Sequence, residues 1–217
     1  MENDNEFVLL KSRSSQACIR EGYHFYTGQF RKIFRNTWPL AIVFALLFTA
    51  ASAMPVLISP NLLLAGIALG TLAVILLLWT VRWRLRKRQI LEKVGPIPFK
   101  AWMRHLGMPI LIGLTCLFII SVLAMLTCLP TIIMMAANWQ SQMGVMNGDP
   151  SGMPDYVRWM TIIVFLLAGF IQAYVWLTIL GPTHLMKGSI AQREKEMKEF
   201  NTKNQNNNEE KAIVYRP

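Results

Sequence analysis

Four long apolar runs without a single charged side chain determine what this chain can fold into. They cover residues 38–59, 62–81, 108–137 and 159–180. As a helix, about 20 apolar residues span the hydrocarbon layer of a bilayer, which is about 30 Å thick. The runs therefore predict an all-α integral membrane protein with four transmembrane helices, arranged as one hairpin at 38–81 and a second at 108–180.

Charged residues lie almost entirely on one side of these runs. If the runs cross the membrane alternately, residues 1–37, 82–107 and 181–217 share one face, and they hold 6, 8 and 7 Lys or Arg, or 21 of 22. Only Arg158 falls on the other face. Because Lys and Arg concentrate in cytoplasmic segments, we expect a multi-pass protein of the cell membrane whose N- and C-termini are cytoplasmic. The net charge of +10 then indicates anionic lipid head groups, and not nucleic acid, as the partner.

The segment 1–37 carries an amphipathic pattern ahead of the first span. Apolar and aromatic side chains recur at spacings of three and four after Ser14 or Ser15, either of which is a plausible N-cap. We interpret this segment as an interfacial helix in the head-group layer that leads through Trp38-Pro39 into the first span.

The other connections are predicted from their breakers and charges. Residues 82–107 form a basic cytoplasmic loop with a second short interfacial helix, and residues 138–158 form the external loop of the second hairpin. Pro130 is expected to end or kink the third run. Gly181-Pro182 is expected to end the fourth, so that residues 181–217 hold a charged helix and a disordered tail.

Small residues indicate how the first two spans pack. Thr49 continues a series of alanines at intervals of four on the first span, and Gly66 and Gly70 form GxxxG on the second. Lipid tails are as apolar as leucine, so helices associate where small side chains let their backbones approach. We expect these stripes to seal the hairpin within one chain, with homodimerisation as the alternative. The predicted packing residues are Ala41, Ala45, Thr49, Gly66 and Gly70.

Two groups of cations are the strongest interaction signal. Juxtamembrane Lys and Arg are attracted to an anionic leaflet, although the same charges also fix the orientation of a hairpin during insertion, and that role alone could account for them. The predicted lipid- or partner-docking residues are Arg82, Arg84, Arg86, Lys87 and Arg88, together with Arg31, Lys32 and Arg35.

The sequence offers little catalytic chemistry. The four runs contain no Asp, Glu, Lys, Arg or His, which disfavours proton-coupled transport, and Gln172 is expected to form an interhelical hydrogen bond. The histidines His24, His105 and His184 all fall on the cytoplasmic side, but their spacing matches no metal-ligand motif. No catalytic residue, cofactor or metal is therefore predicted.

Two short segments resemble each other. Residues 30–36 and 99–105 share the pattern F-[RK]-x-Φ-Φ-R-[NH], where Φ is apolar, and each is followed by a proline and a span. This pattern is compatible with a repeat of two similar halves and equally with chance similarity between apolar segments.

The stretch Arg20-Glu21-Gly22-Tyr23, followed by residues 30–34 and Trp38-Pro39, resembles the first helix of poorly characterised bacterial multi-span proteins. These include the membrane domain found beside glycerophosphodiester phosphodiesterases. The resemblance covers about 25 residues. It implies a membrane fold, and no activity or site residue is carried over.

Three functions are compatible with these features. The first is a non-enzymatic accessory or scaffold protein that docks anionic lipid or a partner through its basic cytoplasmic face. The second is a subunit of an oligomeric, permease-like transporter whose pathway forms between protomers. Besides lipid, a further copy of the chain or another membrane protein is an expected partner. An enzyme acting through the histidines at the cytoplasmic interface is the least favoured.

Overall fold

The computed structural model describes residues 11–58, 60–88, 97–148 and 154–214, and all regular structure in these residues is helical. A π-helix, η1 (Met54–Ile58), and a 3₁₀-helix, η2 (Pro60–Leu62), join the first hairpin. The α-helices are α1 (Ser15–Gly28), α2 (Phe30–Ala53), α3 (Leu63–Lys87), α4 (Phe99–Arg104), α5 (Gly107–Met146), α6 (Asp155–Leu177) and α7 (Leu180–Val214).

Four helical segments are long and apolar enough to cross a membrane: Phe30–Leu57, Leu63–Lys87, Gly107–Met146 and Tyr156–Asn204. Their outer faces expose large apolar side chains; Leu64, for example, is 78% exposed and Phe118 69%. So much exposed apolar surface is unfavourable in water and is suited to a lipid environment. The predicted all-α fold with four transmembrane helices is confirmed.

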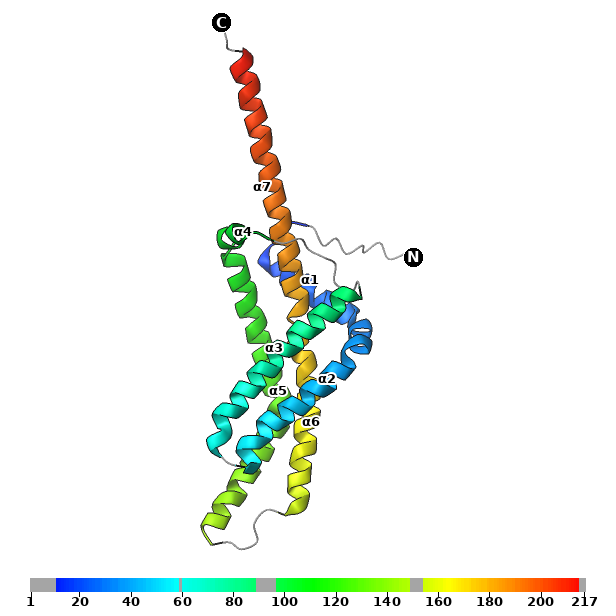
Figure 1. Cartoon of the computed structure of the whole chain (residues 1–217), viewed down its shortest axis with the longest axis vertical. Helices are drawn as coiled ribbons and strands as arrows, with labels where there is room; N and C mark the ends of the chain where they lie inside the picture. Colours follow the sequence, from blue (N-terminus) through cyan, green and yellow to red (C-terminus); the bar gives the residue numbers. More distant parts are fainter. Residues whose placement is uncertain (1–10, 59, 89–96, 149–153, 215–217) are drawn as a thin grey trace.

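The helices form an elongated bundle (Figure 1). Helix α2 packs against both α3 and α6, α5 packs against α6, and α1 packs against α7 and α5. One core cluster joins α2, α3 and α6, with Phe44, Leu77 and Ala173 among its members. A second joins α1, α5 and α7 through Cys18, Ile112 and Ile190. Helices α1 and α4 lie at the same end of the bundle, and α7 extends away from that end (Figure 1).

The first spanning helix begins earlier than predicted. Ser14 is the N-cap of α1, as expected, and its hydroxyl accepts from the N–H of Ala17 at 3.3 Å. Helix α1 ends at Gly28, and the carbonyl of Gln29 accepts from the N–H of Ile33 at 3.0 Å to start α2. The predicted boundary at Trp38-Pro39 is wrong, because Pro39 lies inside α2. Transmembrane helices tolerate an internal proline where neighbouring helices support them.

Helix α5 is longer than predicted. It continues through Pro130 to Met146, so most of the predicted external loop 138–158 is helical in the described residues. Two polar side chains are held on this extension by other segments. Asn138 is buried and donates to the Thr161 hydroxyl at 3.1 Å, and Gln142 donates to the carbonyl of Val56 at 2.8 Å. These tertiary contacts stabilise helix where the local sequence suggests a loop.

The fourth span is interrupted at Thr178-Ile179, three residues before the predicted end at Gly181-Pro182. Pro182 lies in the first turn of α7, where a missing N–H costs no helical hydrogen bond. In place of the predicted disordered tail, α7 is helical to Val214. No Gly or Pro follows Gly188 within that helix, so no helix breaker interrupts it.

Candidate functional site

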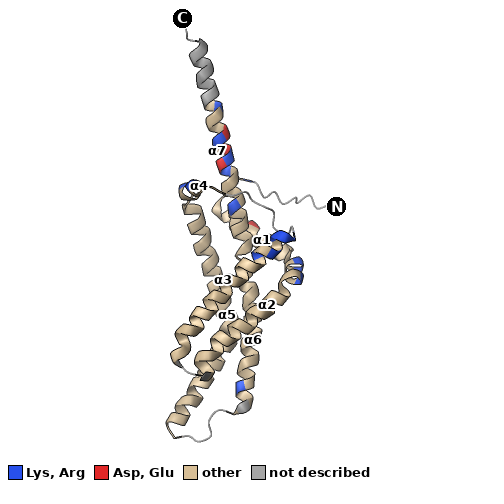
Figure 2. Cartoon of the chain, in the orientation of Figure 1, with Lys and Arg blue, Asp and Glu red and all other residues tan. Residues whose placement is uncertain are grey.

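Cations gather at one end of the bundle. Of the Lys and Arg residues that the structure describes, all but Arg158 lie at the end from which α7 extends, or on α7 beyond it (Figure 2). We call this the basic end. Arg158 lies in the first turns of α6, at the opposite end.

The cluster predicted in a loop at 82–107 is part of a helix. Arg82 to Lys87 form the last two turns of α3, and Arg88 is its C-cap. Val81 and Leu85 anchor this end because both are fully buried. Between them, Arg82 and Arg84 are half-buried, whereas the next three cations are exposed. Cations are favoured at a helix C-terminus, where the backbone dipole is negative.

A second group of cations comes from the start of α2. Arg31, Lys32 and Arg35 are exposed on its first two turns. Because α2 and α3 are packed antiparallel neighbours, the start of α2 lies beside the end of α3 (Figure 2). Within the described chain, no side chain of the eight predicted docking residues forms a hydrogen bond or ion pair. Of these eight residues, Lys87 makes a cation–π contact in the described chain: its Nζ lies 3.9 Å from the centre of the Trp83 ring.

The three histidines have different surroundings. His24 is exposed on α1, and His184 is buried on α7. His105 follows α4, and its Nε2 lies 3.7 Å from Oε1 of Glu194, the carboxylate that Arg104 contacts at 3.3 Å. Among the described residues, no three His, Cys, Asp or Glu side chains are grouped so as to hold a metal ion.

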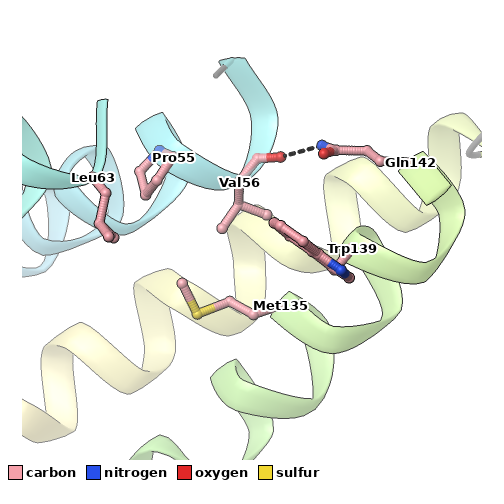
Figure 3. A pocket seen from close by; sticks show the side chains of 6 residues that line it. All are labelled: Pro55, Val56, Leu63, Met135, Trp139 and Gln142. Carbon is pink, nitrogen blue, oxygen red and sulfur yellow. Dashed lines mark hydrogen bonds between the residues drawn. The ribbon is translucent and has the colours of Figure 1, made fainter. Parts of the chain in front are cut away.

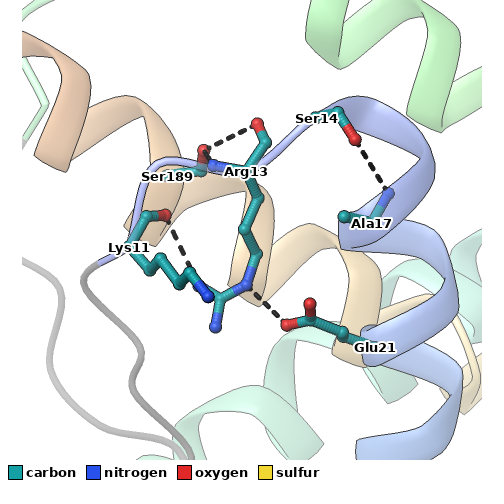
Figure 4. Close-up of polar contacts among 6 residues, drawn as sticks. All are labelled: Lys11, Arg13, Ser14, Ala17, Glu21 and Ser189. Carbon is teal, nitrogen blue, oxygen red and sulfur yellow. Dashed lines mark hydrogen bonds and ion pairs between the residues drawn. The ribbon is translucent and has the colours of Figure 1, made fainter.

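A polar network ties the residues before α1 to α7 (Figure 4). The N–H of Arg13 donates to the Ser189 hydroxyl at 2.9 Å, and that hydroxyl lies 3.2 Å from the carbonyl of Arg13. Arg193 donates to the same carbonyl at 2.7 Å. The Arg13 side chain is buried and pairs with Glu21 at 2.6 Å. No sequence pattern predicted this network, because its two sides are separated by 176 residues.

The opposite end of the bundle holds an apolar pocket of about 180 Å³ (Figure 3). The hydrogen bond from Gln142 to the Val56 carbonyl spans its rim between α5 and η1. Among the described residues no charged side chain lines it, so these residues offer space but no acid, base or nucleophile. Its lining residues are Pro55, Val56, Leu63, Met135, Trp139 and Gln142.

The predicted packing residues are divided between two interfaces. Gly66 faces α2 of the same chain, since a Cβ there would lie 2.5 Å from the carbonyl oxygen of Ala51. Gly70 also faces Ala51, at 3.9 Å. On the predicted stripe, Ala45 lies instead against Gly169 of α6, whose Cβ would be 3.1 Å from its Cα. The two glycines thus pack against α2 within one chain, but Ala45 does not pair with GxxxG, because α2 packs against α6 as well as α3.

The other two members of the stripe, Ala41 and Thr49, are also buried. Ala41 is fully buried and belongs to the core cluster that joins α2, α3 and α6. The Thr49 hydroxyl donates to the carbonyl of Ala45 at 2.7 Å. Buried Gln172 accepts from the Thr127 hydroxyl at 2.9 Å, which confirms the interhelical hydrogen bond expected for it.

Comparisons of the whole chain with protein-family models, with curated protein sequences and with solved structures find no match.

Proposed function

We propose that this chain is a non-enzymatic, multi-pass protein of the cell membrane that gathers anionic lipid through its basic end. In this proposal the basic end faces the cytoplasm, and both chain termini lie there. The observation that carries it is a set of eight cations on the adjacent ends of α2 and α3 whose side chains form no hydrogen bond or ion pair within the described chain.

The chemistry of these ends favours lipid as the partner. Cations close to an anionic leaflet gain about 1 kcal/mol each, and less where salt screens them. Trp38 on α2 is 48% exposed and Trp83 on α3 59%. Indole rings concentrate at the depth of the lipid head groups. The cations beside these rings would therefore lie at the level of lipid phosphates.

Lipid selectivity in reconstituted vesicles tests the proposal. Spin-labelled phosphatidylglycerol and phosphatidylcholine report which lipid contacts the protein. We expect the wild-type chain to enrich phosphatidylglycerol severalfold, and Arg84→Gln/Lys87→Gln/Arg88→Gln to lose most of this enrichment. High salt should reduce it in the wild type, since screening weakens exposed charge interactions.

The matched control removes three cations from the part of α7 that extends beyond the bundle: Lys195→Gln/Lys198→Gln/Lys203→Gln. It has the same net charge as the test variant, and it should keep the enrichment. Equal enrichment in the wild type and the test variant would contradict the proposal. If a protein that co-purifies with the chain were lost in the test variant while lipid enrichment stayed unchanged, a protein partner would replace lipid.

A further inference from the structure

Two cations of the α3 cluster, Arg82 and Arg86, share one side of the helix. Arg82 and Arg86 are four residues apart, so they lie one helical turn apart on the same side of α3. Each directly follows a buried residue, Val81 or Leu85, of the core cluster. Arg82 is half-buried as a result. Arg82 therefore borders the protein core, Arg86 is exposed one turn further along the same side, and Lys87 stacks on Trp83.

The first turns of α7 complete the same region. Leu180 belongs to the core cluster that contains Val81 and Leu85. His184 follows it by four residues and Lys187 by three more, a spacing that keeps all three on one side of α7. His184 is only 4% exposed and Lys187 is half-buried. Neither was predicted as a docking residue.

These side chains form one electrostatic group. The charges of Arg82 and Arg86 act on both His184 and Lys187. No hydrogen bond or ion pair joins the side chains of these four residues to any part of the described chain. Two carboxylates of α1 and α7 have other partners: Glu21 pairs with Arg13, and Glu194 with Arg104 and His105.

Such an arrangement is costly without an anion. Three like charges repel one another, and the partial burial of Arg82 and Lys187 removes water that would screen them. A bound anion with two negative charges would offset both costs. Arginine also binds two phosphate oxygens at once through its planar guanidinium, which fixes the orientation of a phosphate.

We propose that Arg82, Arg86 and Lys187, with His184 beside them, form a site for the phosphomonoester head group of a membrane lipid. This site specifies which lipid head group is bound, and it rests on the lipid docking proposed above. It lies where α3 leaves its apolar run, beside the exposed ring of Trp83, at the depth of lipid phosphates. A phosphomonoester carries close to two charges at pH 7, whereas the phosphodiester of phosphatidylglycerol carries one. The three positive charges of Arg82, Arg86 and Lys187 match the former better.

The test compares two lipids that differ in phosphate charge. The purified full-length chain in neutral detergent is titrated with phosphatidic acid or phosphatidylglycerol, and bound lipid is counted by native mass spectrometry. We expect phosphatidic acid to bind about tenfold more tightly than phosphatidylglycerol, which corresponds to about 1.4 kcal/mol. Arg82→Gln/Lys187→Gln should remove this preference, and Lys187→Arg, which keeps the charge, should retain it.

Two further results separate this site from general docking. The variant Arg84→Gln/Lys87→Gln/Arg88→Gln, which leaves Arg82, Arg86 and Lys187 in place, should weaken the binding of both lipids and leave their ratio unchanged. Arg82→Gln/Lys187→Gln should have a thermal midpoint without lipid at or above that of the wild type, because it removes two cations that repel each other. Equal affinities in the wild type, or an unchanged preference in Arg82→Gln/Lys187→Gln, would overturn the site while leaving general docking intact.

A competition arm identifies the source of the phosphate. Inorganic phosphate and glycerol 3-phosphate are added at millimolar concentration to the chain loaded with phosphatidic acid. We expect neither to displace the lipid, because neither has acyl chains. Complete displacement by inorganic phosphate would overturn the lipid assignment and make the ligand a soluble phosphate.

Discussion

The backbone of Gly22 in α1 lies directly against the backbone of Gly181 in α7. A Cβ built on Gly181 would collide with the carbonyl oxygen of Gly22, and a Cβ built on Gly22 would lie 2.5 Å from the backbone nitrogen of Pro182. No side chain could move aside to relieve either clash, because the atoms belong to the two backbones. The crossing of α1 over α7 therefore requires glycine on both helices.

We expect Gly22→Ala to destabilise the chain by about 1–3 kcal/mol, as overpacking a closely packed interface does. Gly28→Ala is the matched control, because a Cβ at Gly28 has nothing within 4 Å. The midpoints of thermal unfolding in detergent, followed by circular dichroism, measure both effects. Equal midpoints for Gly22→Ala and Gly28→Ala would show that the two helices do not meet at this crossing.

The thiol of Cys18 reports on the same crossing. Burial raises the pKa of this thiol above its ordinary value, since loss of water disfavours the thiolate. We expect slow maleimide labelling at pH 7 in a chain whose other cysteines, Cys116 and Cys128, are alanine. Labelling should accelerate on Gly22→Ala, because separation of α1 from α7 exposes the thiol and lowers its pKa. Fast labelling in the parent chain would contradict the burial of Cys18.

A similar pair tests the first hairpin. We expect Gly66→Ala to cost about 1–3 kcal/mol, because the new Cβ would lie 2.5 Å from the backbone oxygen of Ala51. Gly113→Ala, also inside a spanning helix, has nothing within 4 Å and should gain about 0.5–1 kcal/mol from the higher helix propensity of alanine. Unfolding by sodium dodecyl sulfate measures both. A neutral Gly66→Ala would place α3 away from α2.

Ser189 should hold the residues before α1 onto α7. Ser189→Ala removes the acceptor of the buried Arg13 N–H, and an unsatisfied buried donor costs about 1–3 kcal/mol. We expect faster trypsin cleavage after Lys11 and Arg13 in this variant, measured by mass spectrometry of the released peptides. Ser15→Ala, whose hydroxyl makes no hydrogen bond within the described chain, should be cut at the wild-type rate.

Local sequence was a good guide wherever an interaction depends on residues close together in the chain. The apolar runs predicted the four spans because each span must satisfy its own backbone hydrogen bonds in lipid. Ser14 was a predicted N-cap because its partner, Ala17, is three residues away. Gln172 was expected to bond across helices because an amide has no water to bind at that depth.

Helix ends were predicted less well where distant segments stabilise them. Pro130 and Gly181-Pro182 are breakers in isolation, and yet α5 passes through the first and α7 begins across the second. Asn138 and Gln142 lie in a stretch that suggests a loop, and partners on α6 and η1 hold it in a helix. Propensity is a small term that packing overrides.

The sequence by itself determined the class of the protein, four spans with cations at one end, because hydropathy and charge act residue by residue. Only the tertiary structure decided which helices meet: Gly22 with Gly181, Ala45 with Gly169, and Arg13 with Ser189. The same holds for the site that joins Arg82 and Arg86 to Lys187, because α3 and α7 are separated by two further spans along the chain. Contacts of this kind depend on how backbones approach in three dimensions, and no local pattern encodes them.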